Sequence, residues 1–408
     1  MVMFVKILLS ILFYIPFSLT SLEVQIQNPI SEFLHTSKTQ YEEVLNDSKN
    51  SEIIHFVIGN ESADLDSIIS SISYAYLLYQ ENTSNRAELY IPLMNIHREE
   101  ITLRKDILYL FQLFDISIDD LLFLDDNVPL NSLFEQKRLR LNLVDHNVLR
   151  PRQEHFSDAI ERIVDHHVDE NKDYPLIANE NKLIAVVGSN ATLIAEKVFS
   201  SQVATPKEFA ILLAPILIDT SNLKSAEKTT YRDTEAAKEL QNLAVTFPQD
   251  FYQKLLDAKN DISGLTPSML LSKDFKEYLD GNILYGISSL PSAVKWNLED
   301  LELVGETIQK YAYERNLTYL ILLMSSNDSL AKRNILVYSP SIDLLRAFDV
   351  YVQSDEVLKN ILIPSSFSET FQASFYRTKN SFARKQLQPL FHFSSNPEIK
   401  ITFESLKN

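Results

Sequence analysis

At 408 residues the chain is too long for one ordinary core, and its 45% hydrophobic and 23% charged residues are typical of a globular protein of two domains. The net charge of −17 argues against binding to nucleic-acid polymers or anionic membranes, and a polyanionic substrate would need metals and local basic residues to reverse the potential. No cysteine is present, which excludes disulfides and thiolate metal sites, so any metal ion must bind through oxygen and nitrogen.

The first residues carry a short apolar run. Lys6 precedes the run at 7–19, which is too short for a typical transmembrane helix and has the form of a signal-peptide core. Residues 1–21 are therefore either a signal or targeting segment or an overextended start before a protein that begins near Leu22. No other run is long and apolar enough to span a membrane.

Short apolar runs alternate with amphipathic stretches through the first half of the chain. After a polar helix within 23–50, strands are predicted at 53–58, 89–94, 139–144, 160–164 and 183–187. Helices are predicted at 67–80, 101–114, 192–199 and 206–217. This alternation is typical of an α/β domain with a doubly wound, mostly parallel sheet, in which ligands bind at the carboxyl ends of the strands.

The second half predicts a smaller α/β domain. Residues 225–275 are helical and charged and would form the end of the first domain and a connector. Strands are predicted at 282–290, 317–324 and 335–338. We therefore place the first domain at 22–235 and the second at 236–408.

Acidic residues follow the predicted strands. Asp64 and Asp66 come after the first strand and Asp145 after the third, so all three would share one rim of the sheet. The alternative for the first pair is a helix N-cap, since Asp favours that position. The alternative for Asp145 is a surface salt bridge with Arg150 or Arg152.

Asp165-His166-His167 is the most informative motif of the chain. An isolated Asp-His-His would be an ordinary loop, but here one imidazole can ligate a metal while the other contacts an anion or acts as a general acid. Asp219 follows the apolar run at 212–218, where a carboxylate is costly without a cation or a donor. Carboxylates and imidazoles gathered from several strand ends suit a site for two divalent cations.

Two further segments carry anion-binding chemistry. Basic residues near the C-terminus suit phosphate oxygens, although a solvated helix face is the alternative; they are Arg377, Lys379, Arg384 and Lys385, with Lys295 as a weaker addition. The segment 188–192, Gly-Ser-Asn-Ala-Thr, offers backbone N–H groups for packing against the site or for an anion, or is a plain helix N-cap. No Gly-x-Ser-x-Gly elbow is present, so a serine hydrolase is a poor fit.

Together these motifs resemble the DHH phosphoesterase superfamily, specifically its exopolyphosphatase branch, which is related to the yeast-type enzyme and to prune. The resemblance covers about residues 30–395, and the C-terminal half resembles the DHHA2 domain, ending in Ala383-Arg-Lys-Gln386. The motifs that carry it are Gly59-Asn-Glu-Ser-Ala-Asp-Leu-Asp-Ser-Ile68, Val144-Asp-His-Asn147, Val164-Asp-His-His167, Gly188-Ser-Asn-Ala-Thr-Leu193 and Leu217-Ile-Asp-Thr-Ser-Asn-Leu223.

The resemblance implies two α/β domains with the active site in the cleft between them. It implies two divalent cations, Mg²⁺ or Mn²⁺ with Co²⁺ or Zn²⁺ as further options, and Asp66 and Asp145 would lie nearest to bridging both. The implied ligands are Asp64, Asp66, Asp145, His166 and Asp219.

The resemblance also implies substrate contacts. His167 would contact the terminal phosphate, and Arg384 and Lys385 would reach it from the second domain. Asn60 stands where the pyrophosphatase relatives have His; it fits the exopolyphosphatase and prune pattern and, as a weaker ligand, favours Mg²⁺. The relatives usually have Ser-Arg before further lysines, whereas Phe382-Ala383 precedes Arg384 here, so weaker affinity for a phosphate chain is expected.

We therefore expect a metal-dependent exopolyphosphatase, in which hydroxide formed between two cations attacks the terminal phosphorus of inorganic polyphosphate. Asp145, His166 and His167 would lie at the reacting centre. The alternatives are a hydrolase of pyrophosphate, or of cyclic or short-oligonucleotide phosphodiesters, with the same fold, and a non-catalytic scaffold. The resemblance implies a location in the cytoplasm, or in the secretory pathway or another organelle if residues 1–21 are a signal. The oligomeric state is left open.

Overall fold

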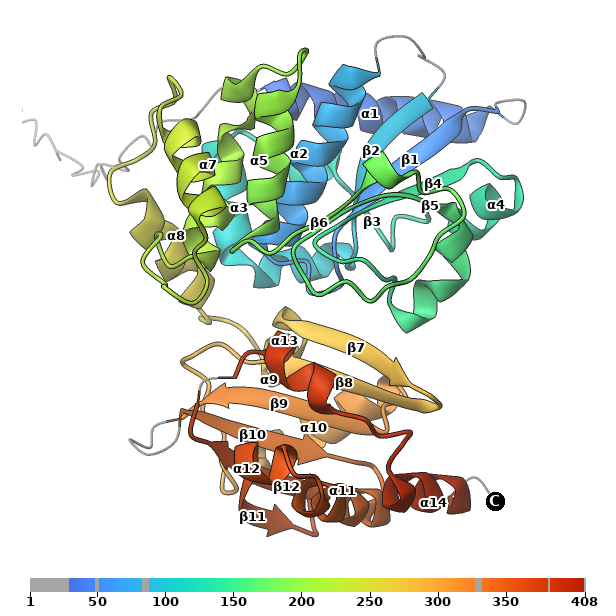
Figure 1. Cartoon of the computed structure of the whole chain (residues 1–408), viewed down its shortest axis with the longest axis vertical. Helices are drawn as coiled ribbons and strands as arrows, with labels where there is room; N and C mark the ends of the chain where they lie inside the picture. The colour runs from blue at the N-terminus through green and yellow to red at the C-terminus, as the bar shows by residue number, and fades with distance from the viewer. Residues whose placement is uncertain (1–28, 48–50, 83–87, 327–331, 381, 407–408) are drawn as a thin grey trace, which may run out of the picture.

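The computed structural model describes residues 29–47, 51–82, 88–326, 332–380 and 382–406, which form two α/β domains, one above the other in Figure 1. The expected signal segment at 1–21 lies outside the described residues. Within the described part of the chain, no helix combines the length and the apolar character needed to cross a membrane.

The first domain contains a parallel sheet of six strands in the order β3-β2-β1-β4-β5-β6. The strands are β1 Ile53–Ile58, β2 Glu88–Met94, β3 Leu122–Phe123, β4 Leu139–Val144, β5 Ile160–Asp165 and β6 Lys182–Ile184. The doubly wound parallel sheet is thus confirmed. The strand predicted at 183–187 is shorter, because β6 is an edge strand that pairs only with the last three residues of β5.

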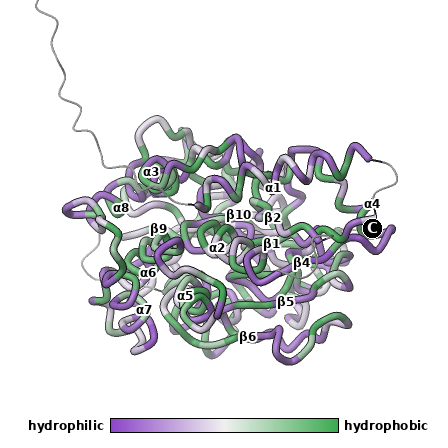
Figure 2. Tube along the Cα trace, turned by 90° about the horizontal axis from the view of Figure 1, so that it is seen from above, coloured by the Kyte–Doolittle hydropathy of each residue, from purple (hydrophilic) through white to green (hydrophobic). Residues whose placement is uncertain are grey.

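Helices cover both faces of this sheet. They are α1 Pro29–Asn46, α2 Leu65–Glu81, η1 Arg98–Leu103, α3 Lys105–Leu113, η2 Ile118–Asp120, α4 Leu130–Glu135, η3 Pro151–Ala159, η4 Asn179–Asn181, α5 Asn190–Ser200, η5 Pro206–Leu212, α6 Leu213–Asp219, α7 Tyr231–Gln241 and α8 Phe251–Asn260. One core lies under α2, α3 and α5 to α8, and the other under α4, η3 and the end of α1. Every residue of α2 from Leu65 to Leu78 is buried, so α2 is the central helix of the domain. Hydrophobic segments run through the middle of the molecule in the view of Figure 2.

The second domain contains a mixed sheet in the order β11-β12-β10-β9-β8-β7, in which only β8 and β9 are parallel. Its strands are β7 Phe275–Asp280, β8 Ile283–Ser289, β9 Tyr319–Ser325, β10 Arg333–Tyr338, β11 Ile363–Ser368 and β12 Ala373–Thr378. Its helices are α9 Pro267–Lys273, α10 Leu301–Glu314, α11 Ile342–Ser354, α12 Leu358–Ile361, α13 Arg384–Leu387, η6 Gln388–Leu390 and α14 Pro397–Ser405. The edge strand β7 and helix α13 lie on the side that faces the first domain (Figure 1).

The segment between the sheets belongs largely to the first domain. Phe251 and Leu255 of α8 are buried in the core that α2 and α3 cover. Leu270 and Leu271 of α9 are buried in a core of the second domain. We therefore propose that the change of domain falls between α8 and α9, later than residue 235.

Candidate functional site

The predicted metal ligands meet at the carboxyl end of the first sheet. The chain leaves β1 toward β2 on one side and β4 toward β5 on the other, so β1 and β4 flank the switch point of the sheet. Asp64 and Asp66 lie where the chain passes from β1 into α2, Asp145 follows β4, and His166 follows β5. Sheets of this topology bind ligands at this position.

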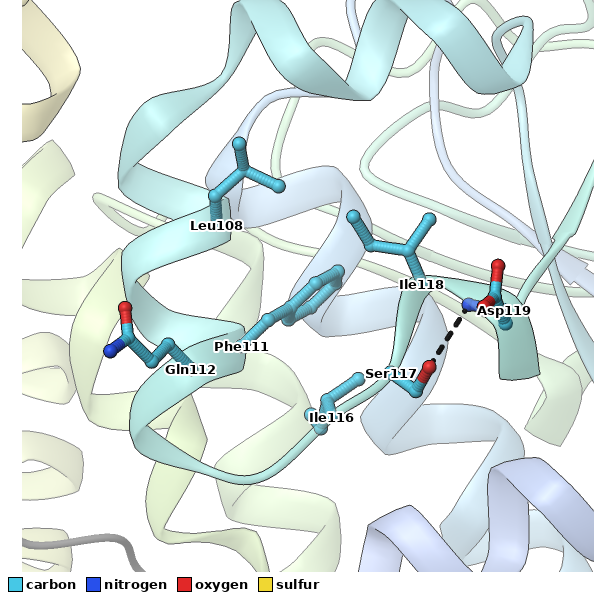
Figure 3. Close-up of a pocket in the computed structure, with 7 residues that line it drawn as sticks. All are labelled: Leu108, Phe111, Gln112, Ile116, Ser117, Ile118 and Asp119. Atoms are coloured by element: carbon cyan, nitrogen blue, oxygen red, sulfur yellow. Dashed lines mark hydrogen bonds between the residues drawn. The ribbon is translucent and has the colours of Figure 1, made fainter.

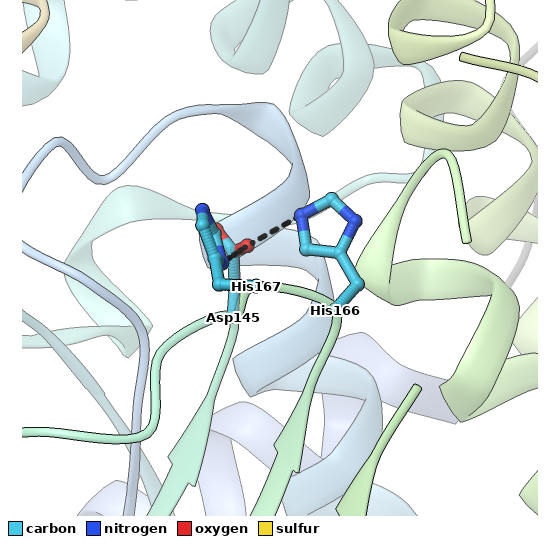
Figure 4. A group of neighbouring side chains, drawn as sticks. All are labelled: Asp145, His166 and His167. Carbon is cyan, nitrogen blue, oxygen red and sulfur yellow. Dashed lines mark ion pairs between the residues drawn. The ribbon is translucent and has the colours of Figure 1, made fainter. Parts of the chain in front are cut away.

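Asp145 is held in a strained conformation by several contacts. Its φ of 61° lies in the left-handed region, which is uncommon for residues other than glycine and clusters at functional sites. One carboxylate oxygen accepts hydrogen bonds from Asn60 Nδ2 at 2.7 Å and from Ser67 Oγ at 2.5 Å. The other lies 3.2 Å from His166 Nε2 and 3.6 Å from His167 Nδ1. Figure 4 shows both imidazoles beside this carboxylate.

Asp165 orients the two histidines. Its Oδ1 accepts hydrogen bonds from the backbone N–H groups of His166 and His167 and lies 2.8 Å from His167 Nδ1. Its Oδ2 accepts a hydrogen bond from Asn147 Nδ2 at 2.6 Å. His166 Nδ1 lies 3.0 Å from the Val187 carbonyl, which fixes the proton on that nitrogen and turns Nε2 toward the carboxylates. Asp165 is therefore a buried support for the ligands.

Helix α5 begins against Asp66. The backbone N–H groups of Asn190 and Ala191 donate to the two Asp66 oxygens at 2.6 and 2.8 Å, and His166 Nε2 lies 3.9 Å from Oδ2. The predicted anion contact of the segment 188–192 is thus made to a carboxylate of the protein itself. Ser189 occupies the N-cap position, but its hydroxyl makes no capping hydrogen bond.

Asp233 fixes the turn that leads into α5. Its carboxylate accepts hydrogen bonds from Gly188 N, Thr192 Oγ1 and both the backbone and the hydroxyl of Thr230. A Cβ at Gly188 would lie 2.5 Å from the Lys228 carbonyl oxygen, so only glycine fits there. These contacts hold the N–H groups of α5 where Asp66 meets them.

Asp64 and Asp219 complete the group of carboxylates. Asp64 is the N-cap of α2 and accepts a hydrogen bond from Ser67 N at 3.1 Å, so the capping interpretation is confirmed. Asp219 is the last residue of α6, and its buried Oδ2 has no hydrogen-bond partner among the described residues. A buried carboxylate oxygen without a partner is costly, and a cation would supply the missing interaction.

The site carries more negative charge than its histidines neutralise. Burial, and then the charges of Asp145 and Asp219, raise the pKa of Asp66 well above its ordinary value. Burial raises the pKa of Asp219 to about 6, and burial also raises the pKa of Asp64. Burial would raise the pKa of Asp145 too, but the hydrogen bond with His166 and the charges of His167, His166 and Lys276 together outweigh it and lower that pKa. Burial would lower the pKa of His166, yet the hydrogen bond with Asp145 and the charges of Asp145, Asp66 and Asp165 together raise it to about 10.

The donor set fits a divalent cation. Asp145, His166 and His167 each offer one ligand atom, and these atoms lie within 4.8 Å of one another. Carboxylate oxygens and neutral imidazole nitrogens suit Mg²⁺, Mn²⁺ and Zn²⁺. Asp66 Oδ2 keeps a lone pair beyond the one that the Asn190 N–H uses, whereas Oδ1 accepts from both the Ala191 N–H and the Ser70 hydroxyl.

Two lysines near this group were not predicted. Lys259 lies in the last turn of α8, and the charges of Asp219, Asp106 and Asp64 raise its pKa although burial would lower it. Lys276 of β7 is among the charges that lower the pKa of Asp145. A single lysine in a charged helix or beside a strand leaves no sequence pattern that marks it as part of a site.

The predicted basic residues occupy different surroundings. Arg384 of α13 is mostly buried and donates to the carbonyl and the carboxylate of Asp274, at 2.8 and 2.7 Å. Lys295, Arg377 and Lys385 are exposed, so their contact with substrate stays a prediction. Lys379 is also exposed.

The salt bridge considered for Asp145 is not formed. Arg152 instead donates to both carboxylate oxygens of Glu277 on β7, at 2.9 and 3.1 Å. Asn60, expected near the substrate, uses its amide nitrogen on Asp145 and its oxygen on the backbone and hydroxyl of Ser62. Asn60 thus holds Asp145, a predicted ligand, in place by hydrogen bonds.

A separate pocket of about 460 Å³ lies between α3 and η2 (Figure 3). It is lined by Leu108, Phe111, Gln112, Ile116, Ser117, Ile118 and Asp119. Its lining contains no histidine and only one carboxylate, so it lacks the chemistry of the centre described above.

Comparisons with known proteins cover both domains. The family model described as DHH family, N-terminal domain, matches residues 55–215, and the model of the DHHA2 domain matches residues 253–392. The chain is 35% identical over 304 residues to a Schizosaccharomyces pombe protein named "Putative exopolyphosphatase", covering 69% of this chain and 75% of that one. It is 28% identical over 239 residues to a manganese-dependent inorganic pyrophosphatase of Methanothrix thermoacetophila, covering 58% and 69%. A crystal structure of a Methanococcus jannaschii "putative family II inorganic pyrophosphatase" has the same fold, with a TM-score of 0.55, 19% identity and coverage of 86% of this chain and 99% of that one.

Proposed function

The chain belongs to the DHH–DHHA2 family of exopolyphosphatases, and we propose that it removes terminal phosphate from inorganic polyphosphate. The observation that carries this proposal is the convergence of Asp66, Asp145 and His166 at the switch point of the sheet. The presence of His167 beside them supports a hydrolase, because a scaffold would not need a second, partly exposed imidazole there.

We propose that two divalent cations bind here, Mg²⁺ or Mn²⁺. The manganese-dependent relative supports a requirement for divalent metal. The residues that would hold them are Asp64, Asp66, Asp145, His166 and Asp219. Such cations, when bound, lower the pKa of water and neutralise charge on phosphate oxygens. Asn60 donates a hydrogen bond to Asp145 and offers no imidazole nitrogen to a metal. The site would therefore favour Mg²⁺ over softer ions, which prefer nitrogen ligands.

His167 would contact the terminal phosphate. Its Nδ1 faces Asp165, so its Nε2 is left to donate a proton to a phosphate oxygen. Asp165 holds the ring in this orientation. This contact would place the second ring nitrogen of His167 beside the terminal phosphate.

The second domain would supply cations for the remainder of the phosphate chain. Lys276 acts on Asp145, and Arg384 pairs with Asp274, whose charge acts on Asp64; Lys385 is adjacent to Arg384 in sequence. Lys295 and Arg377 would contact phosphates further along the chain. Guanidinium and ammonium groups bind phosphate oxygens through charge-assisted hydrogen bonds.

The test is phosphate release from long-chain polyphosphate, pyrophosphate and a cyclic nucleotide, each with Mg²⁺, Mn²⁺ or EDTA. We expect fast, EDTA-sensitive release from polyphosphate. Preference for pyrophosphate would favour the second candidate, which the manganese-dependent relative supports. Preference for the nucleotide would indicate a phosphodiesterase, and no release with any metal would indicate a scaffold.

A further inference from the structure

Glu277 joins the second domain to two loops of the candidate metal centre. Its backbone N–H, on the edge strand β7, donates to Glu61 Oε1 at 3.0 Å. Glu61 lies in the loop after β1, between Asn60 and Asp64. The Glu277 carboxylate pairs with Arg152, which lies in the first turn of η3 just after the loop that carries Asp145.

The contact between Arg152 and Glu277 is well built. Two parallel hydrogen bonds join the guanidinium and the carboxylate, and Arg152 Nη2 also donates to the Arg315 carbonyl at 2.9 Å. The Glu277 side chain is only 6% exposed, whereas that of Arg152 is 50% exposed. Two charge-assisted hydrogen bonds from a planar guanidinium fix the geometry of the pair more strongly than one exposed ion pair would, so this contact holds β7 against η3.

The contact between Glu277 and Arg152 also fixes the position of Lys276, the neighbouring residue on β7. Successive side chains of a strand point to opposite faces, so Lys276 points away from the face on which Glu277 meets Arg152. The charge of Lys276 acts on Asp145, His146 and Asp274. Fixing Glu277 therefore fixes the lysine that precedes it.

We propose that Glu277 and Arg152 are positioning residues, which dock β7 on the loops of the metal centre and so place Lys276 for phosphate. This inference rests on the proposed function. If the two domains are docked for only a fraction of the time, the apparent affinity for substrate is the affinity of the docked protein multiplied by that fraction. Once substrate is bound, the chemistry is unchanged, so the effect falls on KM.

The kinetic test compares Glu277→Gln with wild type in the full chain. We expect KM for long-chain polyphosphate to rise about tenfold, kcat to stay within about twofold, and the Mn²⁺ dissociation constant to stay unchanged. The matched control is Glu369→Gln, which removes an exposed ion pair with Arg346, 2.6 Å long, inside the second domain, and should change nothing. The inference would be overturned if KM were unchanged, or if kcat fell about tenfold while KM stayed the same.

A second measurement does not depend on turnover. Because the chain has no cysteine, Glu135→Cys on α4 and Gln353→Cys on α11 provide one exposed label in each domain. Glu277→Gln should broaden the spin-label distance distribution, and Arg152→Glu combined with Glu277→Arg should restore it. Unchanged distances would overturn the inference. Altered and restored distances without phosphate release from wild type would reject the proposed function and keep the positioning role.

Discussion

Replacement of Asp145 by Asn tests the metal centre most directly, because the structure predicts that folding survives. The φ of 61° suits Asn, one of the residues that adopt the left-handed region most readily. The new Oδ1 can accept from Asn60 and Ser67, as the carboxylate does, while the new Nδ2 faces Nε2 of a neutral His166. Only the charge is lost, so we expect a cost of about 1–2 kcal/mol in unfolding free energy.

The effect on turnover is expected to be far larger. At 3.2 Å, the distance from Asp145 Oδ1 to His166 Nε2, two unit charges interact by roughly 5 kcal/mol at an effective dielectric constant of about 20. If Asp145 stabilises a bound cation by a similar amount and this stabilisation is lost in the transition state, we expect kcat to fall by roughly 10³- to 10⁴-fold.

The assay is phosphate release at saturating Mn²⁺, with thermal unfolding followed by circular dichroism on the same sample. Wild-type turnover in the variant would refute the assignment of Asp145 as a ligand. A loss of structure at room temperature would instead refute the claim that Asn fits this backbone.

Three further predictions concern the charges and supports of the centre. Mn²⁺ affinity measured by calorimetry should rise with pH, because metal binding must release protons from Asp219 and His166. The pKa of Asp219 is raised to about 6 and that of His166 to about 10. A constant affinity between about pH 5 and 8 would contradict this prediction. Lys259→Met should tighten Mn²⁺ binding by about tenfold, since a positive charge near Asp219 is removed; weaker binding in the same titration would show the reverse role. Asp233→Ala should lower the free energy of unfolding by about 3 kcal/mol, because four hydrogen-bond donors lose their acceptor. Urea denaturation of the metal-free protein would measure this loss. A change below about 1 kcal/mol would mean that water replaces the carboxylate.

Local pattern predicted those parts of the fold that are buried on both faces. The runs at 53–58 and 139–144 are β1 and β4 in full, because central parallel strands are apolar at nearly every position. Once these strands were placed, the rule for switch points brought Asp64, Asp66 and Asp145 to one rim.

Elements that depend on distant partners were missed. Strands β7 and β11, at the two edges of the second sheet, mix polar with apolar residues, most of them partly or fully exposed, and so leave no apolar run. Lys259 and Glu277 likewise acquire their surroundings only when α8 packs on the first core and β7 meets the first domain. Their roles come from tertiary contacts that no local spacing encodes.

The charge of the centre also sets the order of binding. Asp66, Asp145 and Asp219 face one another within a protein of net charge −17, so a polyphosphate chain approaching the metal-free site would be repelled. Divalent cations reverse this local potential, and Lys276 and Arg384 then add attraction from the second domain. We therefore expect metal to bind before substrate, and we expect polyphosphate binding to be lost in EDTA even though every basic residue is still present.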